Sequence, residues 1–233
     1  MAHAQADPFD IPIAARPLHF FWVVDTSGSM GLEGKIQSLN TAVREALPHM
    51  RRVARENANA QVLIRVLEFG SRVRWLFDEA VDVQAFQWID LVPGATTPMG
   101  QALATVADEL RMPPMDERAL APVLALVSDG QPTDNFPDGL ERLNQQAWAQ
   151  KAVRVAIAIG RDADLETLHE FVGPNGRVLE ANNSDQLTEF IRWASTVAVK
   201  AASGAASQIV PGAGRRPVVA LQLPDDPGGN DVW

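Results

Sequence analysis

Two aspartates that follow apolar segments are the residues of this sequence best suited to chemistry. Asp25 comes directly after the apolar run 18–24, and Asp129 follows the apolar run 122–127 by one serine. If both runs are parallel strands, their carboxyl ends lie at the same edge of a sheet, where ligands bind in the crevice at which the strand order reverses. The sequence therefore predicts that Asp25 and Asp129 lie close together at one sheet edge.

Two serines extend the oxygen-rich pattern around the first aspartate. Asp25, Ser27 and Ser29 occupy alternate positions, so in an extended loop their side chains point to the same side. Carboxylate and hydroxyl oxygens are hard donors that suit Mg²⁺, Mn²⁺ or Ca²⁺ and disfavour zinc or copper. Because Mg²⁺ keeps several waters, a site with few direct protein ligands suits it well, although oxygen donors alone do not choose between Mg²⁺ and Mn²⁺.

Together with two later segments, these residues resemble the metal-ion-dependent adhesion site (MIDAS) of the von Willebrand factor A (vWA) family. That site combines a D-x-S-x-S motif, a later threonine before G-x-A-L, and an aspartate in S-D-G at the end of a later strand. The positions of this sequence that match the motif are Asp25, Ser27, Ser29, Thr97 and Asp129.

The resemblance covers residues 16–202, and no motif position is missing. Thr96 and Thr97 are neighbours, and the three-residue distance to Gly100 favours Thr97 as the ligand. The resemblance implies that one aspartate acts through water, which leaves the ion under-neutralised and one coordination position open. An Asp or Glu carboxylate of a partner protein could fill that position. Asp134, in the same stretch as Asp129, is interpreted as a loop residue that caps the next helix.

Among vWA proteins, the sequence is most similar to bacterial stand-alone members, the TerY-like group associated with tellurium resistance and stress operons. The compact domain and the stretch SDGQPTD carry this similarity. It implies a protein-interaction module without catalytic turnover, which works alongside a kinase, a phosphatase or an ATPase. Nothing in the residues selects among these three partners.

A serine hydrolase is the alternative function. Ser29 lies in the stretch SGSMG after an apolar run, which imitates the strand-to-helix elbow of nucleophilic serines. Its histidine would have to be His169, near Asp162 and Asp164, and the three residue types follow in the order Ser-Asp-His. On a short helix, His169 has a simpler role as a surface or core-edge residue. An acyl or phosphonate probe that reacts regardless of Mg²⁺ would favour the hydrolase.

The alternation of apolar runs with helical patterns predicts the elements that must position these residues. Near-continuous apolar runs are typical of strands that are buried on both faces of a parallel sheet. We expect an α/β fold, a three-layer sandwich with a mostly parallel central sheet and helices on both faces, which is the Rossmann-like vWA fold. The expected strands are 18–24, 62–69, 73–77, 122–127, 153–159 and 177–180. The expected helices are 36–55, 83–91, 98–111, 140–151, 164–172 and 184–202.

Three regions are expected along the chain. An N-terminal arm covers residues 1–16, the vWA domain residues 17–202, and a Gly/Pro-rich tail residues 203–233. The tail ends in an acidic and apolar stretch, LPDDPGGNDVW, whose aspartates could dock at the metal beside Asp25. A frayed, solvated terminus is the simpler alternative.

Composition excludes several other classes of protein. The net charge of -9 argues against partners such as nucleic acid or an anionic membrane surface. Cysteine is absent, which excludes a disulfide framework, a thiolate zinc site and a cysteine nucleophile, and fits a cytoplasmic protein. We expect no targeting segment at the polar N-terminus and no membrane span, because the longest uncharged run, 91–107, is interrupted by two prolines.

Overall fold

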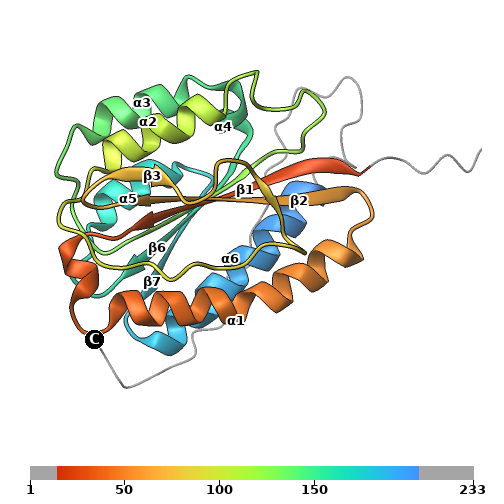
Figure 1. Ribbon diagram of the computed structural model, residues 1–233. Coiled ribbons are helices and arrows are strands. Elements are labelled where there is room, and N and C mark those ends of the chain that lie inside the picture. The colour runs from red at the N-terminus through yellow and green to blue at the C-terminus, as the bar shows by residue number, and fades with distance from the viewer. Residues whose placement is uncertain (1–14, 205–233) are drawn as a thin grey trace, which may run out of the picture.

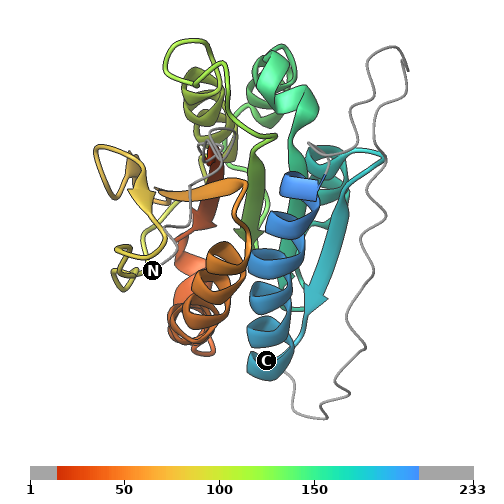
Figure 2. The ribbon, with the colours of Figure 1, turned by 90° about the vertical axis from the view of Figure 1, so that its right-hand side faces the viewer.

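The computed structural model describes residues 15–204. Nearly all of the expected arm and tail, including the tail aspartates, lie outside the described residues. Within the described part, a central sheet is covered by helices on both faces, as the edge-on view shows (Figure 2). The expected three-layer, mostly parallel α/β fold is therefore confirmed.

The sheet has seven strands, in the order β3-β2-β1-β5-β6-β7, with β4 also paired to β2. Strands β1, β2, β5, β6 and β7 are parallel, whereas β3 and β4 run antiparallel to β2. The chain places β2 on one side of β1 and later β5 on the other, so the strand order reverses at β1. The strands are β1 (Arg16–Asp25), β2 (Ala60–Phe69), β3 (Val73–Trp75), β4 (Val81–Asp82), β5 (Val123–Ser128), β6 (Val153–Ile159) and β7 (Arg177–Ala181).

Two helical layers bury the faces of this sheet (Figure 1). Side chains at even positions of β1, such as Phe20 and Trp22, pack with α1 and α6, and those at odd positions, such as Phe21 and Val23, pack with α2, α3 and α5. Because successive side chains of β1 are buried on opposite faces, the sequence of this strand is one continuous apolar run. The helices are α1 (Lys35–Glu56), α2 (Met99–Glu109), α3 (Phe136–Asn144), α4 (Ala147–Lys151), α5 (Leu165–Val172) and α6 (Ser184–Gly204), with a short 3-10 helix, η1 (Gly28–Gly31).

The expected helix at 83–91 is wrong. This segment has a short turn and is otherwise irregular, although Val83, Phe86 and Leu91 are buried in the core as a helix face would be. Side chains of α1 satisfy its backbone: Arg51 donates to the carbonyls of Val83 and Phe86, and the Asn40 amide pairs with both backbone groups of Leu91. Apolar spacing alone could not distinguish a helix from a loop anchored in this way.

The expected helix at 140–151 is also corrected. It begins earlier, at Phe136, and is divided into α3 and α4 by a break at residues 145–146. Within residues 15–204, no helix is long and apolar enough to span a membrane.

Candidate metal centre

The two aspartates meet at the carboxyl edge of the sheet. Asp25 is the last residue of β1, and Asp129 directly follows β5. These strands are parallel neighbours, with Val24 opposite Val127, so both carboxylates emerge at the point where the strand order reverses. Both residues are almost fully buried, with 0% of Asp25 and 1% of Asp129 exposed.

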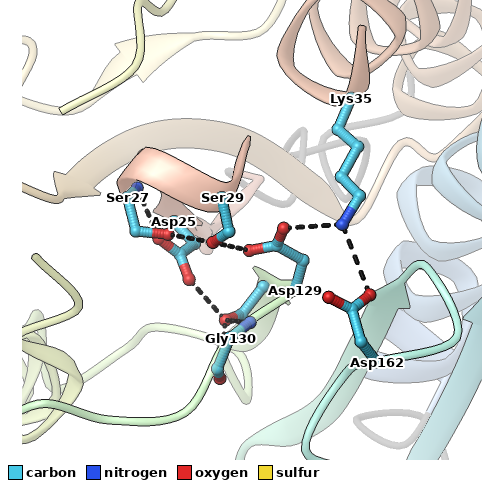
Figure 3. A network of polar contacts seen from close by, with 8 residues as sticks. Asp25, Ser27, Ser29, Lys35, Asp129, Gly130 and Asp162 are labelled. Atoms are coloured by element: carbon cyan, nitrogen blue, oxygen red, sulfur yellow. Dashed lines mark hydrogen bonds and ion pairs between the residues drawn. The ribbon is translucent and has the colours of Figure 1, made fainter. Parts of the chain in front are cut away.

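The carboxylate of Asp25 is held at both oxygens (Figure 3). Its Oδ1 accepts a hydrogen bond of 2.7 Å from the Ser27 amide, and its Oδ2 accepts one of 2.5 Å from the Ser128 hydroxyl. Burial raises the pKa of Asp25 to about 6, and the hydrogen bonds from Ser128 and Ser27 offset part of that rise. A carboxylate that is costly to ionise because it is buried gains from a bound cation.

A chain of hydroxyls links the two carboxylates (Figure 3). The Ser27 and Ser29 hydroxyl oxygens are 2.9 Å apart, and the Ser29 hydroxyl donates to Asp129 Oδ1 at 2.8 Å. The prediction that these serines share an extended loop is wrong for Ser29, which lies in η1. The tight turn nevertheless brings both hydroxyls to the same place.

The two neighbouring threonines have different surroundings. The Thr96 hydroxyl donates to the Gly70 carbonyl at 2.7 Å, so it fastens the loop to the end of β2. Thr97 is held by its backbone amide, which donates to the Thr133 hydroxyl at 3.0 Å. Its own hydroxyl makes no hydrogen bond to the rest of the described chain. It is the threonine left available for a ligand.

The space beside Gly130 shows that these oxygens converge. A Cβ built on Gly130 would lie 3.6 Å from the hydroxyl oxygens of both Ser29 and Thr97 and 3.8 Å from Asp25 Oδ2. Oxygens from three separate segments therefore surround one small space, which glycine leaves open. All five residues predicted as ligands lie around it or are bonded to a residue that does.

The donor set fits a hard divalent cation. Two carboxylates and three hydroxyls supply only oxygen, which Mg²⁺, Mn²⁺ and Ca²⁺ prefer. Residues 15–204 contain no cluster of three or more His, Cys, Asp or Glu side chains that could hold an ion. An ion here would depend on hydroxyls and water for most of its coordination shell, and this favours an ion that keeps its waters.

The sequence reasoning missed Lys35, the first residue of α1. Its ammonium donates to Asp129 Oδ2 at 2.9 Å and to Asp162 Oδ1 at 3.4 Å, and its side chain is only 3% exposed. Burial alone would lower the pKa of Lys35, but the hydrogen bond and charge of Asp129, together with Asp162, raise it above 10.5. The expected helix began one residue later, so no pattern marked Lys35.

The expected role of Asp134 is also corrected. It caps α2 rather than the next helix, because its carboxylate accepts from the amides of Gly100 at 2.8 Å and Gln101 at 2.7 Å. Asn135 caps the next helix, α3, instead. Together with Thr133, Asp134 fastens the segment after Asp129 to the segment that carries Thr97.

The residues of the alternative hydrolase have other contacts. The hydrogen-bond partners of the Ser29 hydroxyl in the described chain are Ser27 and Asp129. His169 lies on the exposed side of α5, and Asp164 caps that helix by accepting from the Thr167 amide. Asp162 pairs with Lys35. The described contacts therefore do not join these residues into a nucleophile and base.

Several solved structures share this fold. The von Willebrand factor type A protein from Catenulispora acidiphila is 16% identical, with a TM-score of 0.58 over 79% of this chain and 43% of that chain. The ArnB paralog VWA2 from Sulfolobus acidocaldarius is 19% identical, with a TM-score of 0.56 over 77% of this chain and 45% of that chain. The chain thus spans less than half of these two proteins.

A third structure with this fold contains a metal ion. Proximal thread matrix protein 1 from the mussel byssus, solved with a zinc-occupied MIDAS motif, is 17% identical, with a TM-score of 0.55 over 79% of this chain and 46% of that chain. At such low identity, the likeness shows the fold alone.

A comparison with curated proteins gave no match. The family is shown instead by the match of the sequence to a family model. Residues 21–193, well over half of the chain, match the model of the von Willebrand factor type A domain. The chain belongs to this family, whose members are known for metal-dependent protein interactions.

Proposed function

We propose that the protein is a protein-interaction module that binds a partner carboxylate through a Mg²⁺-type ion. Asp25, Ser27, Ser29 and Thr97 would hold the ion, with Asp129 acting directly or through water. The observation that carries the proposal is the convergence of oxygens from three segments around the space beside Gly130. When bound, the ion supplies a Lewis-acid position for an anionic oxygen.

The charges of the site explain why the ligand would be a carboxylate. Within residues 15–204, only two acidic side chains, Asp25 and Asp129, face the proposed ion, and hydroxyls and water are neutral. The ammonium of Lys35 already offsets part of the charge of Asp129. A divalent ion would therefore remain under-neutralised, and an Asp or Glu of a partner protein would supply the missing negative charge.

The cellular setting is a further part of the proposal and rests on the sequence resemblance. Similarity to bacterial stand-alone vWA proteins supports a cytoplasmic role in a stress-response or signalling assembly with a kinase, a phosphatase or an ATPase. A module of this kind would have no catalytic turnover. In that case, a phosphonate probe for activated serines should not label Ser29, with or without Mg²⁺.

Thermal and chemical unfolding with added ion tests the metal site. An ion that binds only the native state raises the free energy of unfolding by RT ln(1 + [L]/Kd), about 2.7 kcal/mol at a hundredfold excess over Kd. We expect this increment with Mg²⁺ or Mn²⁺ in the wild type and none in Asp25→Ala. An equal response of the two proteins to millimolar Mg²⁺ would rule out this site.

Partner capture tests the interaction. Thr97→Ala removes one hydroxyl from the proposed shell and should weaken Mg²⁺-dependent partner binding without unfolding the domain. Thr41→Ala is the matched control, because Thr41 is an exposed threonine on α1. Binding that persists in saturating chelator would place the interaction on another face.

A further inference from the structure

Lys35 is part of the proposed site although it is not a ligand. Its ammonium is buried between Asp129 and Asp162 (Figure 3). The two partners differ: the side chain of Asp129 is 0% exposed, whereas that of Asp162 is 73% exposed and is also solvated. The closer contact, at 2.9 Å, is to Asp129. Lys35 therefore acts mainly on a carboxylate that faces the proposed ion.

Because of this contact, the two oxygens of Asp129 have different hydrogen-bond partners. Oδ1 accepts from the Ser29 hydroxyl and faces the hydroxyl cluster, whereas Oδ2 accepts from Lys35. Both oxygens of Asp25 are also engaged, by the Ser27 amide and the Ser128 hydroxyl. In each carboxylate, one oxygen is directed toward another donor, the Ser27 amide or the Lys35 ammonium, so neither carboxylate is arranged to bind a cation through both oxygens.

The position of Lys35 depends on a glycine in the neighbouring loop. Gly160 follows β6 with φ of +87°, a conformation that residues with a Cβ rarely adopt. A Cβ there would lie 3.0 Å from Lys35 Nζ and 2.9 Å from Asp162 Oδ1. Glycine therefore leaves the room in which the ammonium and its second carboxylate meet. The ammonium of Lys35 is thus placed by α1 and by the loops that follow β5 and β6.

We propose that Lys35 is a specificity-determining residue that makes the site prefer Mg²⁺ over Ca²⁺. Ca²⁺ takes six to eight oxygens and often binds carboxylates through both of theirs, whereas Mg²⁺ accepts single oxygens in an octahedron and keeps its waters. By occupying Oδ2, Lys35 withholds the second oxygen of Asp129 and part of its negative charge. Both effects disfavour the ion that needs more protein ligands.

The same ammonium keeps the loaded site attractive to an anion. Asp25 and Asp129 carry two negative charges and Lys35 one positive charge, so these three side chains and a bound divalent ion together carry a single positive charge. The carboxylate of Asp162 is 73% exposed, so water screens most of its charge. One partner carboxylate neutralises it. Without Lys35, the loaded group would already be neutral. This inference rests on the proposed metal site and adds ion choice and anion attraction to it.

The test is a titration of Lys35→Met with Mg²⁺ and with Ca²⁺ by isothermal titration calorimetry at pH 8. Removing a neighbouring positive charge and freeing Oδ2 should tighten Ca²⁺ binding on the order of tenfold and Mg²⁺ binding by less. The ratio of the two dissociation constants therefore shifts toward Ca²⁺. Lys200→Met, at an exposed lysine on α6, removes the same charge from the chain and should leave both constants unchanged.

A second variant covers the case in which Lys35→Met does not fold. Asp162→Asn removes an exposed carboxylate that shares the ammonium, so Lys35 would act on Asp129 alone. Both ions should then bind about twofold more weakly, with the larger loss for Ca²⁺. Unchanged affinities in this variant, or an unchanged ion ratio in folded Lys35→Met, would overturn the role of Lys35. If the wild type binds neither ion, the proposed function itself fails.

Discussion

Two ion pairs of this domain, one buried and one partly exposed, have similar lengths but different surroundings. Lys35 and Asp129 are 2.9 Å apart at the sheet edge, and Arg65 and Glu109 are 2.9 Å apart between β2 and α2. The Arg65 guanidinium also lies 4.3 Å from the centre of the Trp75 ring, whereas Asp129 also accepts a hydrogen bond from Ser29. The second pair fastens a helix to the sheet, and the first shares its carboxylate with a candidate ligand site.

The comparison suggests that the same interaction has two uses. Where the carboxylate has no role other than holding its cation, the pair contributes only to stability. Where the carboxylate faces a cluster of hydroxyl and carboxylate oxygens, the pair also sets how much negative charge that cluster offers to an ion. Substitutions in the two pairs should therefore respond differently to divalent ions.

Breaking the pair at the sheet edge should have the largest effect. Lys35→Met leaves Asp129 buried without a cation, and we expect a loss of about 3–4 kcal/mol in the free energy of unfolding in chelator. Millimolar Mg²⁺ should restore most of this loss, because the ion replaces the missing positive charge. Urea unfolding with and without Mg²⁺ measures both values. A loss that Mg²⁺ cannot reduce would mean that Asp129 does not sense the ion.

The second largest effect is expected in the pH dependence of the free energy of unfolding, which Asp25 gives to the region at the sheet edge. Because the pKa of Asp25 is raised to about 6 from 3.8, the folded state binds more protons than the unfolded state between these values. In chelator, this group therefore lowers stability as the pH rises through 4–6, by up to about 3 kcal/mol in total. Asp25→Asn should remove this dependence.

With the ion present, this dependence should largely cancel. Mg²⁺ binds the deprotonated carboxylate, so the stabilisation by Mg²⁺ should decrease progressively as the pH falls below about 6. Unfolding curves of wild type and Asp25→Asn across pH 4–8 show both trends. A Mg²⁺ increment that stays constant from pH 5 to pH 8 would contradict ligation by Asp25.

Breaking the pair between β2 and α2 should have a smaller and simpler effect. Arg65→Met keeps an unbranched side chain over Trp75 but leaves Glu109, which is partly exposed and can be hydrated. We expect a loss of about 2 kcal/mol. This loss should be the same in chelator and in Mg²⁺. Partial recovery with Mg²⁺ would show that the two regions are coupled and would contradict a purely stabilising role of the Arg65–Glu109 pair.

The smallest effect is expected at Asp134, which touches the site region without facing the ion. Asp134→Ala removes the cap of α2 and should cost about 1 kcal/mol. Because the same carboxylate fastens the loops that carry Thr97 and Asp129, Mg²⁺ affinity should also fall modestly. Asp138→Ala, in the first turn of α3, is a comparison, because the described hydrogen bond of the Asp138 carboxylate is to Asn135 of the same helix end. Equal Mg²⁺ affinities in the two variants would limit Asp134 to its capping role.

The sequence predicted the parallel strands and both aspartates because each depends on local patterns. A strand covered on both faces is a continuous apolar run, and the residue after such a run lies at the sheet edge. The irregular segment 83–91 could not be predicted in this way, because its backbone is satisfied by Asn40 and Arg51 on a distant helix.

The burial and ion pairing of Lys35 could not be predicted for the same reason. Its two partners are 94 and 127 residues away, so no local pattern marks it as buried. The pairing of Asp134 with α2, and the different contacts of Thr96 and Thr97, also arise only when separate loops meet. Local sequence identified the oxygen donors, whereas their mutual arrangement required the fold. The ligand roles of the five residues remain predictions.

The separation of the site along the chain has a consequence for its order of assembly. The Ser29 hydroxyl and Asp129 are hydrogen-bonded although they are 100 positions apart in the sequence. During synthesis, Asp25, Ser27 and Ser29 leave the ribosome long before β5 exists, so for that time they form only half of a coordination shell. The sheet must close before an ion finds its full set of oxygens. A metal bound at this site would thus be a late addition to a finished domain and not a nucleus around which the chain folds.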